Sequence, residues 1–256
     1  MNRIAGAFSS GKAFIPFVTG GDPDLETTER VLYALAGAGA DAIEIGVPFS
    51  DPIAEGPVIE AASERALGAG CTVEKLFGLA ARVRADIKAP LLFMTYYNPV
   101  FARGVSSFAA RCAESGVDGL IVPDLPFEER DELLGPCVSE GVELISLIAP
   151  TSGDRIAGIA KSSGGFLYCV SSLGVTGERR ELGNDARRMV ERVRRVSDIP
   201  CAVGFGVSTP EQARAIAGFA DGVIVGSAIV RIIAEHGRDC VGPVGRFAEE
   251  IKRAIS

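Results

Sequence analysis

Two acidic side chains stand close together in IEIGVPFSDPIAEGP, the segment that runs from Ile43 to Pro57. Glu44 lies between two isoleucines in an apolar run, whereas Glu55 follows eleven residues later, among proline and small residues. A carboxylate in an apolar strand is unfavourable unless it is paired or functional. Loss of hydration raises the pKa of such a group, which suits acid–base catalysis at neutral pH. We therefore predict a catalytic role for Glu44. The alternative is a structural acid satisfied by the backbone or by Lys12.

Two glycine-containing segments near the C-terminus have the composition of phosphate-binding turns. GFGVSTP contains Gly204 and Gly206, and VIVGSA contains Gly226 and Ser227. Each segment follows an apolar run and precedes a helical pattern, so its backbone N–H groups can be exposed beside a helix N-terminus. Glycine required for a tight turn would explain either segment alone. The two together predict a phosphate site.

Further candidates lie where other apolar runs end. The segment from Ser171 to Asp185 exceeds the usual length of a strand-to-helix connection, which favours a binding or lid role over a simple connector. Aromatic residues in these places can line a flat apolar pocket, although ordinary packing would explain each one alone. The aromatic candidates are Tyr96, Tyr97, Tyr168 and Phe205. Asp51 and Asp124 each stand beside a proline and could instead form Asx-turns.

The elements that would position these residues alternate along the chain. Eight short apolar runs predict parallel strands buried on both faces, and they begin at Ala13, Ala42, Pro90, Gly119, Glu143, Phe166, Cys201 and Gly222. Between them, apolar residues at spacings of three and four predict helices at 25–38, 73–87, 105–115, 128–140, 153–162, 185–197 and 209–219. We also predict an extra helix at 57–69, after the second strand, and a C-terminal helix at 241–255.

Eight alternating units within 256 residues predict an α/β protein, a single (β/α)8 TIM barrel whose one domain spans residues 1–256. A doubly wound open sheet is the alternative. Such a sheet usually carries a glycine-rich fingerprint after its first strand, and TGGDP does not match one.

Composition narrows the classes of function. The net charge of −7 argues against nucleic acid or an anionic membrane as a partner. No apolar run reaches the roughly 18 residues of a membrane helix, and the start lacks the apolar core of a signal peptide. The six cysteines are scattered without a CxxC pair, which predicts free thiols and a cytoplasmic protein. His236 is the only histidine, so we expect neither a histidine triad nor a histidine-rich metal site.

These segments resemble the tryptophan synthase alpha chain family. The resemblance covers nearly the whole chain in order, through FIPFVTGGDP, IEIGVPFSDPIAEGPVIE, YYNPVF, VPDLPFEE, SSLGVTG, VGFGVSTPEQ and DGVIVGSAIV. It implies a lyase of tryptophan biosynthesis that cleaves indole-3-glycerol phosphate into indole and glyceraldehyde 3-phosphate by a retro-aldol reaction.

The resemblance also implies roles for the acids. Glu44 would act first as general acid and then as general base, and Glu55 would stabilise the positive charge on the protonated indole. Glu55 stands where the family commonly has aspartate, so its longer side chain must fold back or its loop must shift. Tyr168 would lie beside the reacting carbons.

Other roles follow from the same motifs. Phe17, Tyr96 and Phe205 resemble indole-pocket residues, Thr176 resembles a lid residue that binds the second carboxylate, and the phosphate binders would be Gly177, Gly206, Gly226 and Ser227. The family implies an αββα complex with a beta chain that carries pyridoxal phosphate. This chain would need no cofactor itself, and its contact surface would include Asp51, Asn98 and Phe101. Three alternatives stay open: a free-standing lyase that releases indole, a non-catalytic activator of the beta chain, and a barrel acting on another sugar phosphate.

Overall fold

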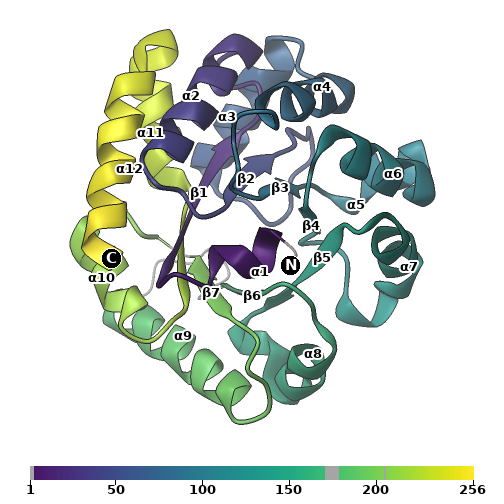
Figure 1. Cartoon of the computed structure of the whole chain (residues 1–256), viewed down its shortest axis with the longest axis vertical. Coiled ribbons are helices and arrows are strands. Elements are labelled where there is room, and N and C mark those ends of the chain that lie inside the picture. The colour runs from purple at the N-terminus through teal and green to yellow at the C-terminus, as the bar shows by residue number, and fades with distance from the viewer. Residues whose placement is uncertain (1–2, 171–178, 205) are drawn as a thin grey trace.

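A computed structural model of the protein describes residues 3–170, 179–204 and 206–256. Eight parallel strands pair in sequence order, and the last pairs with the first, so the sheet closes into a barrel (Figure 1). The strands are β1 (Ala13–Thr19), β2 (Ile43–Gly46), β3 (Leu91–Met94), β4 (Gly119–Ile121), β5 (Glu143–Ile148), β6 (Leu167–Val170), β7 (Cys201–Gly204) and β8 (Gly222–Val225). The predicted (β/α)8 barrel is confirmed, and each strand lies within the run that predicted it.

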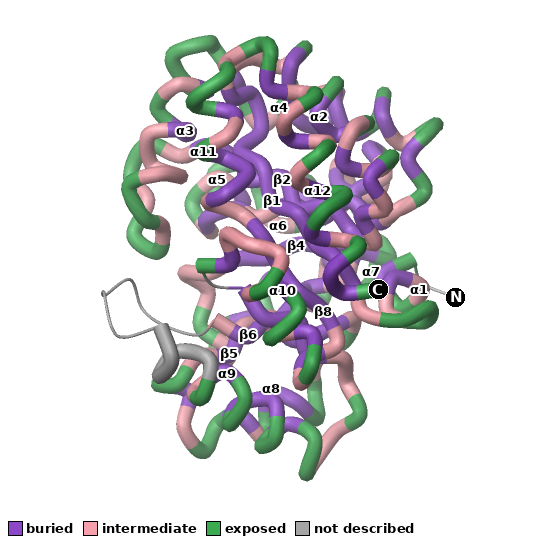
Figure 2. The backbone as a smooth tube through the Cα atoms, turned by 90° about the vertical axis from the view of Figure 1, so that its left-hand side faces the viewer, coloured by how far each residue is buried: buried purple, intermediate pink, exposed green. Residues whose placement is uncertain are grey.

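The strands are apolar throughout because both of their faces are covered. In β1, Phe14 and Val18 pack outward against the helices, whereas Ala13 and Ile15 belong to the cluster that fills the barrel. Successive side chains of a strand point to opposite faces, so one apolar run supplies both cores. Figure 2 shows this arrangement, with buried residues at the centre and exposed residues along the outer turns.

Helices surround the barrel, as predicted. They are α2 (Leu25–Gly37), α3 (Pro57–Gly68), α4 (Val73–Val83), α6 (Val105–Ser115), α7 (Asp131–Glu140), α8 (Ile156–Ser162), α9 (Arg179–Arg194), α10 (Pro210–Ala217), α11 (Ser227–His236) and α12 (Val241–Ile255). The extra helix after β2 and the C-terminal helix are confirmed as α3 and α12. Helix α9 begins six residues before its predicted start, and short 3-10 turns at 127–129 and 150–155 precede α7 and α8.

The sequence did not indicate two short helices, α1 (Arg3–Ala7) and α5 (Tyr97–Arg103), and it indicated α11 only as a helical pattern after VIVGSA. Helix α5 carries the NPVF motif, and Pro99 fits there because proline is tolerated in the first turn of a helix.

Glycine caps set several returns from helix to strand. Gly39, Gly116 and Gly141 have φ values of 89°, 75° and 70°. Only glycine adopts this left-handed region without strain, which explains why the sequence has glycine where these helices end.

Helix α1 covers the end of the barrel where the strands begin. Ile4 and Ala7 belong to the interior cluster, and the ring of Phe8 lies 5.3 Å from that of Phe166, just before β6. A Cβ atom on Gly222, the first residue of β8, would lie 3.1 Å from the Phe8 ring. In Figure 1, α1 is seen at the centre of the barrel. The opposite end, where the strands finish, therefore holds the candidate site.

Candidate active site

Glu44 points into the barrel. It lies two residues after Ala42, which belongs to the interior cluster, and its exposed fraction is 0%. Neither carboxyl oxygen has a hydrogen-bond partner among the described residues. Burial raises the pKa of Glu44 well above 4.5, so the protonated carboxyl is favoured. Lys12, the alternative partner, instead donates to the Ala220 carbonyl at 2.7 Å, so it does not satisfy Glu44.

Two aromatic rings share the interior with Glu44 because glycines leave room for them. Phe17 pairs in register with Glu44, and a Cβ atom on Gly46 would lie 2.6 Å from the Phe17 ring. On the other side of the ring, a Cβ atom on Gly226 would lie 3.3 Å from it. Such close approaches explain glycine at the ends of these strands.

Tyr168 on β6 has the same relationship with the end of β7. A Cβ atom on Gly204 would lie 2.7 Å from the Tyr168 hydroxyl oxygen. Burial, and then the charge of Glu44, raise the pKa of Tyr168 well above 10. The phenol therefore stays neutral, and the electrostatic influence of Glu44 reaches it.

Glu55 is half-buried in the loop between β2 and α3. Burial, and then the charge of Glu60, raise the pKa of Glu55 from 4.5 to about 7. The Tyr96 hydroxyl accepts hydrogen bonds from the backbone N–H groups of Ile53 at 3.1 Å and Ala54 at 3.0 Å. Tyr96 thus contacts the loop that carries Glu55, a contact that the sequence did not suggest.

The described phosphate candidates lie at the ends of neighbouring strands. Gly226 is the N-cap of α11, and Ser227 is its first residue. Gly206 follows β7 with a φ of 57°, shortly before Thr209 caps α10. The sequence predicted these glycine-containing turns beside helix N-termini. Backbone N–H groups at such N-termini favour anions. Thr176, Gly177 and Phe205 lie outside the described residues.

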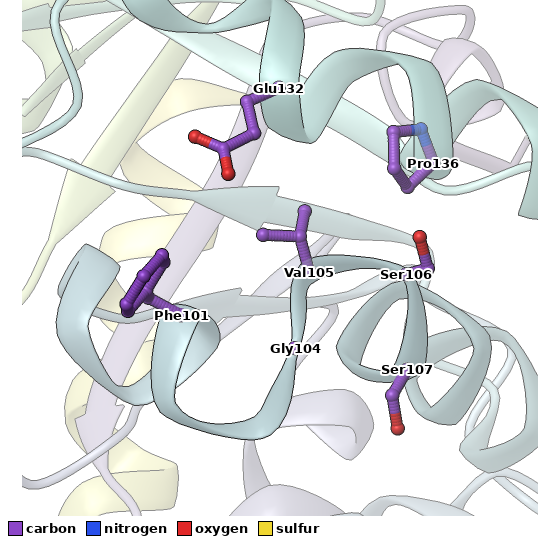
Figure 3. A pocket seen from close by; sticks show the side chains of 7 residues that line it. All are labelled: Phe101, Gly104, Val105, Ser106, Ser107, Glu132 and Pro136. Carbon is purple, nitrogen blue, oxygen red and sulfur yellow. The ribbon is translucent and has the colours of Figure 1, made fainter.

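The three partner-surface candidates are exposed. Asn98 and Phe101 lie on α5, where the side chain of Phe101 is 62% exposed, and Asp51 accepts a hydrogen bond from Ser50 at 2.5 Å. Figure 3 shows Phe101 and Glu132 beside a cavity of about 410 Å³ that lies between α5, α6 and α7. Neither Glu44, Glu55 nor Tyr168 lines this cavity, so it is separate from the carboxyl groups.

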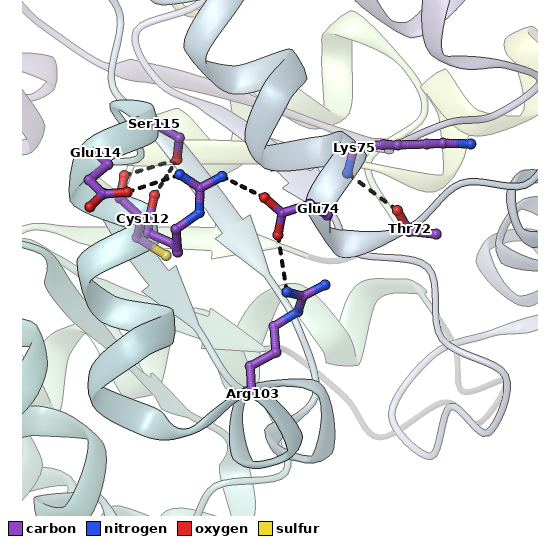
Figure 4. Close-up of polar contacts among 8 residues, drawn as sticks. Thr72, Glu74, Lys75, Arg103, Cys112, Glu114 and Ser115 are labelled. Carbon is purple, nitrogen blue, oxygen red and sulfur yellow. Dashed lines mark hydrogen bonds and ion pairs between the residues drawn. The ribbon is translucent and has the colours of Figure 1, made fainter.

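A surface ion-pair network holds the far end of α5. The carboxylate of Glu74 on α4 binds Arg103 on α5 at 3.0 Å and Arg111 on α6 at 2.6 Å (Figure 4). Arg111 also pairs with Glu114 at 2.9 Å. The network joins three helices at the outside of the barrel.

Sequence reasoning missed two partly buried contacts of aspartates. Asp124, in the loop after β4, accepts from the backbone N–H of Tyr97 through both carboxylate oxygens, at 2.9 and 3.1 Å. Asp22, in the loop after β1, forms two hydrogen bonds with Arg65 on α3, both at 2.8 Å. The partners are 27 and 43 residues apart, so no local spacing announces either contact.

The described residues contain no group of three or more His, Cys, Asp or Glu side chains that could hold a metal ion. None of their helices combines the length and apolar content needed to cross a bilayer. All six cysteines are described, and each is a buried free thiol.

In a barrel of parallel strands, active sites lie at the carboxyl ends of the strands, where this chain places a buried acid and two aromatic rings. The fold and the site define a TIM barrel with a buried carboxyl group at the end where the enzymes of this fold have their active sites. The family model "Tryptophan synthase alpha chain" matches residues 7–255. The chain belongs to this family.

Curated relatives and solved structures similar to this chain are alpha chains of tryptophan synthase. The chain is 50% identical over 247 residues to the tryptophan synthase alpha chain of Picosynechococcus sp., covering 95% of this chain and 94% of the relative. It is 45% identical over 255 residues to that of Lacticaseibacillus casei, covering 100% and 96%. The crystal structure of tryptophan synthase subunit alpha from Legionella pneumophila is similar with a TM-score of 0.91 at 35% identity, covering 100% of this chain and 98% of that one.

A chain from the tryptophan synthase a2b2 complex of Pyrococcus furiosus is also similar, with a TM-score of 0.88 at 39% identity, covering 95% of this chain and 99% of that chain. Membership of the family confirms the enzyme class predicted from the sequence. The protein is a carbon–carbon lyase of tryptophan biosynthesis that cleaves indole-3-glycerol phosphate.

Proposed function

We propose that Glu44 and Glu55 divide the work of this retro-aldol cleavage. The observation that carries the proposal is the Glu44 carboxyl, fully buried in the barrel with both oxygens unpartnered among the described residues. Burial favours its protonated form, so Glu44 can donate a proton to indole C3 at neutral pH. The donation leaves Glu44 as a carboxylate and the indole ring positively charged.

The second step uses the same side chain as a base. The Glu44 carboxylate removes the proton of the side-chain hydroxyl next to C3, and the carbonyl of glyceraldehyde 3-phosphate forms. The bond between C3 and the glycerol carbon breaks, and its electron pair returns to the indole ring. Tyr168, which shares the interior with Glu44, lies beside the reacting carbons in this proposal.

Glu55 acts on the charge that the first step creates. Its carboxylate stabilises the positive ring nitrogen of the protonated indole through the N–H group. With a pKa of about 7, Glu55 is partly ionised at neutral pH. The added methylene relative to the common aspartate makes the placement of its loop important.

The substrate-binding residues of this proposal are those that match the family motifs. The indole lies against Phe17, Tyr96 and Phe205, and Thr176 binds the Glu55 carboxylate. The substrate phosphate is held by Gly177, Gly206, Gly226 and Ser227. Three of these residues support this part of the proposal, because Gly206 after β7 and Gly226 and Ser227 after β8 adjoin helix N-termini.

The chain works in the cytoplasm as a single domain of residues 1–256, in an αββα complex with a tryptophan synthase beta chain. Pyridoxal phosphate resides on that partner, and this chain binds no cofactor. Asp51, Asn98 and Phe101 form the contact surface. The 62% exposure of Phe101 and the similarity to a chain of an a2b2 complex support this assembly.

The test is the release of glyceraldehyde 3-phosphate from indole-3-glycerol phosphate, with and without a beta chain. We expect slow release that rises strongly with the beta chain and falls about a hundredfold or more in Glu44→Gln. Glu114→Gln, an exposed change of the same kind, is the control and should behave as wild type. Fast release at the same rate with and without the beta chain would instead indicate a free-standing lyase. Absence of release, with the beta chain still activated, would indicate a regulatory subunit.

A further inference from the structure

We infer that Tyr96 and Asp124 are positioning residues that hold the Glu55 loop from the two neighbouring strand-to-helix loops. The inference deepens the proposed function and rests on the role of Glu55 proposed there. It connects the loops after β2, β3 and β4 through four hydrogen bonds.

The first contact joins Tyr96 to the loop after β2. The hydroxyl oxygen of Tyr96 accepts from the N–H groups of both Ile53 and Ala54, and Ala54 directly precedes Glu55. Tyr96 is only 2% exposed, and its ring packs 5.2 Å from that of Phe49, at the start of the same loop. The phenol is therefore fixed by packing, and it presents one oxygen to two adjacent backbone donors.

The second contact fixes the backbone from which Tyr96 extends. Tyr96 is the N-cap of α5 and has no side-chain bond to its own helix. Asp124 supplies the missing acceptor from the next loop, because both of its oxygens bind the N–H of Tyr97. A carboxylate is favoured at a helix N-terminus, where the N–H groups lack partners within the helix.

Electrostatics agree with this arrangement. Burial raises the pKa of Tyr96, and the charges of Glu55 and Asp124 raise it further. The phenol stays neutral, and both carboxylates act on the same hydroxyl. Because Glu55 reaches one methylene further than the common aspartate, small movements of its backbone shift its carboxylate relative to the indole nitrogen.

The other end of α5 provides a matched control. Arg103, its last residue, pairs with Glu74 at 3.0 Å, and no hydrogen bond of that pair involves the Glu55 loop. Arg103→Ala therefore loosens the same helix at the end away from Tyr96. A general effect of α5 on the barrel would appear in this variant as well.

The experiment is a double-mutant cycle on kcat and KM with indole-3-glycerol phosphate. We expect Asp124→Ala to lower kcat about tenfold to a hundredfold with little change in KM, since a displacement of about 1 Å can have such an effect. Asp124→Asn, which keeps one acceptor oxygen, should recover much of the activity, and Arg103→Ala should match wild type. In a Glu55→Gln background, Asp124→Ala should change kcat less than about twofold, because its effect passes through Glu55.

Additive losses in the Glu55→Gln background would overturn the inference while leaving the proposed role of Glu55 intact. Wild-type activity of Glu55→Gln alone would overturn that role and, with it, the inference. If Asp124→Ala fails to fold, Tyr96→Phe carries the same cycle, because it removes only the hydroxyl that the loop binds. Wild-type kcat in both Tyr96→Phe and Asp124→Ala would also contradict the inference.

Discussion

The hydroxyl oxygen of Tyr168 lies only 2.7 Å from the position that a Cβ atom on Gly204 would occupy. The two residues come from the adjacent strands β6 and β7, whose register pairs Tyr168 with Ala202 and places Gly204 at the end of β7. A missing side chain on one strand thus makes room for an aromatic ring on the next. The same relationship holds between Gly46 and Phe17. The absence of side chains on these two glycines therefore allows both aromatic rings to pack inside the barrel near Glu44.

We predict that Gly204→Ala displaces Tyr168 and lowers kcat at least tenfold. It should also destabilise the fold by about 1–3 kcal/mol, the usual effect of overpacking. The measurement is kcat together with urea unfolding. Gly158→Ala is the control, since it lies within α8 with no atom within 4 Å of the new Cβ, and it should keep full activity. Wild-type kcat in Gly204→Ala would show that Tyr168 does not need its present position.

The burial of Glu44 should appear in the pH dependence of stability. Its pKa is higher in the folded protein than the 4.5 of the free side chain, so folding is favoured most below pH 4.5 and loses this contribution as pH rises. The loss is about 1.4 kcal/mol for each pH unit up to the folded pKa. Glu44→Gln cannot ionise, so its unfolding free energy relative to wild type should increase as the pH rises above 4.5. Parallel stability curves from urea unfolding would contradict a raised pKa at Glu44.

The ionisation of Glu55 should determine how kcat/KM falls at acidic pH, which is the acidic limb of the pH profile. Its carboxylate must be ionised to stabilise the protonated indole, and its pKa is raised to about 7, so kcat/KM should rise as pH increases through this value. Glu60→Gln removes the negative charge that helps to raise this pKa and should move the limb to lower pH. Glu55→Gln should abolish the limb and lower kcat about 100-fold to 1,000-fold. Profiles of kcat/KM from pH 5.5 to 8.5 test all three, and a limb unchanged in Glu55→Gln would assign it to another group.

The Asp22–Arg65 pair should contribute to stability. Arg65→Ala leaves the fully buried Asp22 carboxylate without its bidentate partner, and we expect a loss of about 2–3 kcal/mol in unfolding free energy. Arg82→Ala, which breaks the more exposed pair with Glu29, is the control and should lose less than about 1 kcal/mol. Equal losses in the two variants would show that burial of Asp22 does not strengthen its pair.

The sequence predicted what depends on local pattern. Strands buried on both faces must be apolar throughout, so each of the eight runs was visible, and Glu44 stood out because it interrupts one of them. Helix α5 was missed because YYNPVF continues the apolar run of β3, and proline within it does not suggest a helix. Whether Lys12 or nothing satisfies Glu44 depends on how distant strands meet, which no spacing reveals.

The contacts around Glu55 illustrate the same limit. Asp124 beside proline suggested an Asx-turn, yet its carboxylate caps a helix that begins 27 residues earlier. Tyr96 suggested an apolar pocket wall, yet its polar end binds backbone N–H groups of another loop. Both partners become neighbours only after the barrel closes.

The closure of the barrel by α1 has a consequence for how protons are supplied. Ile4, Ala7 and Phe8 pack into the end of the barrel where the strands begin. The proposed reaction needs no proton from that end, because the proton that Glu44 donates to C3 is replaced within the same turnover by the one it removes from the hydroxyl. The carboxyl returns to its starting state with zero net exchange with bulk water. Proton supply through the end of the barrel that α1 covers is therefore not needed for continuous catalysis.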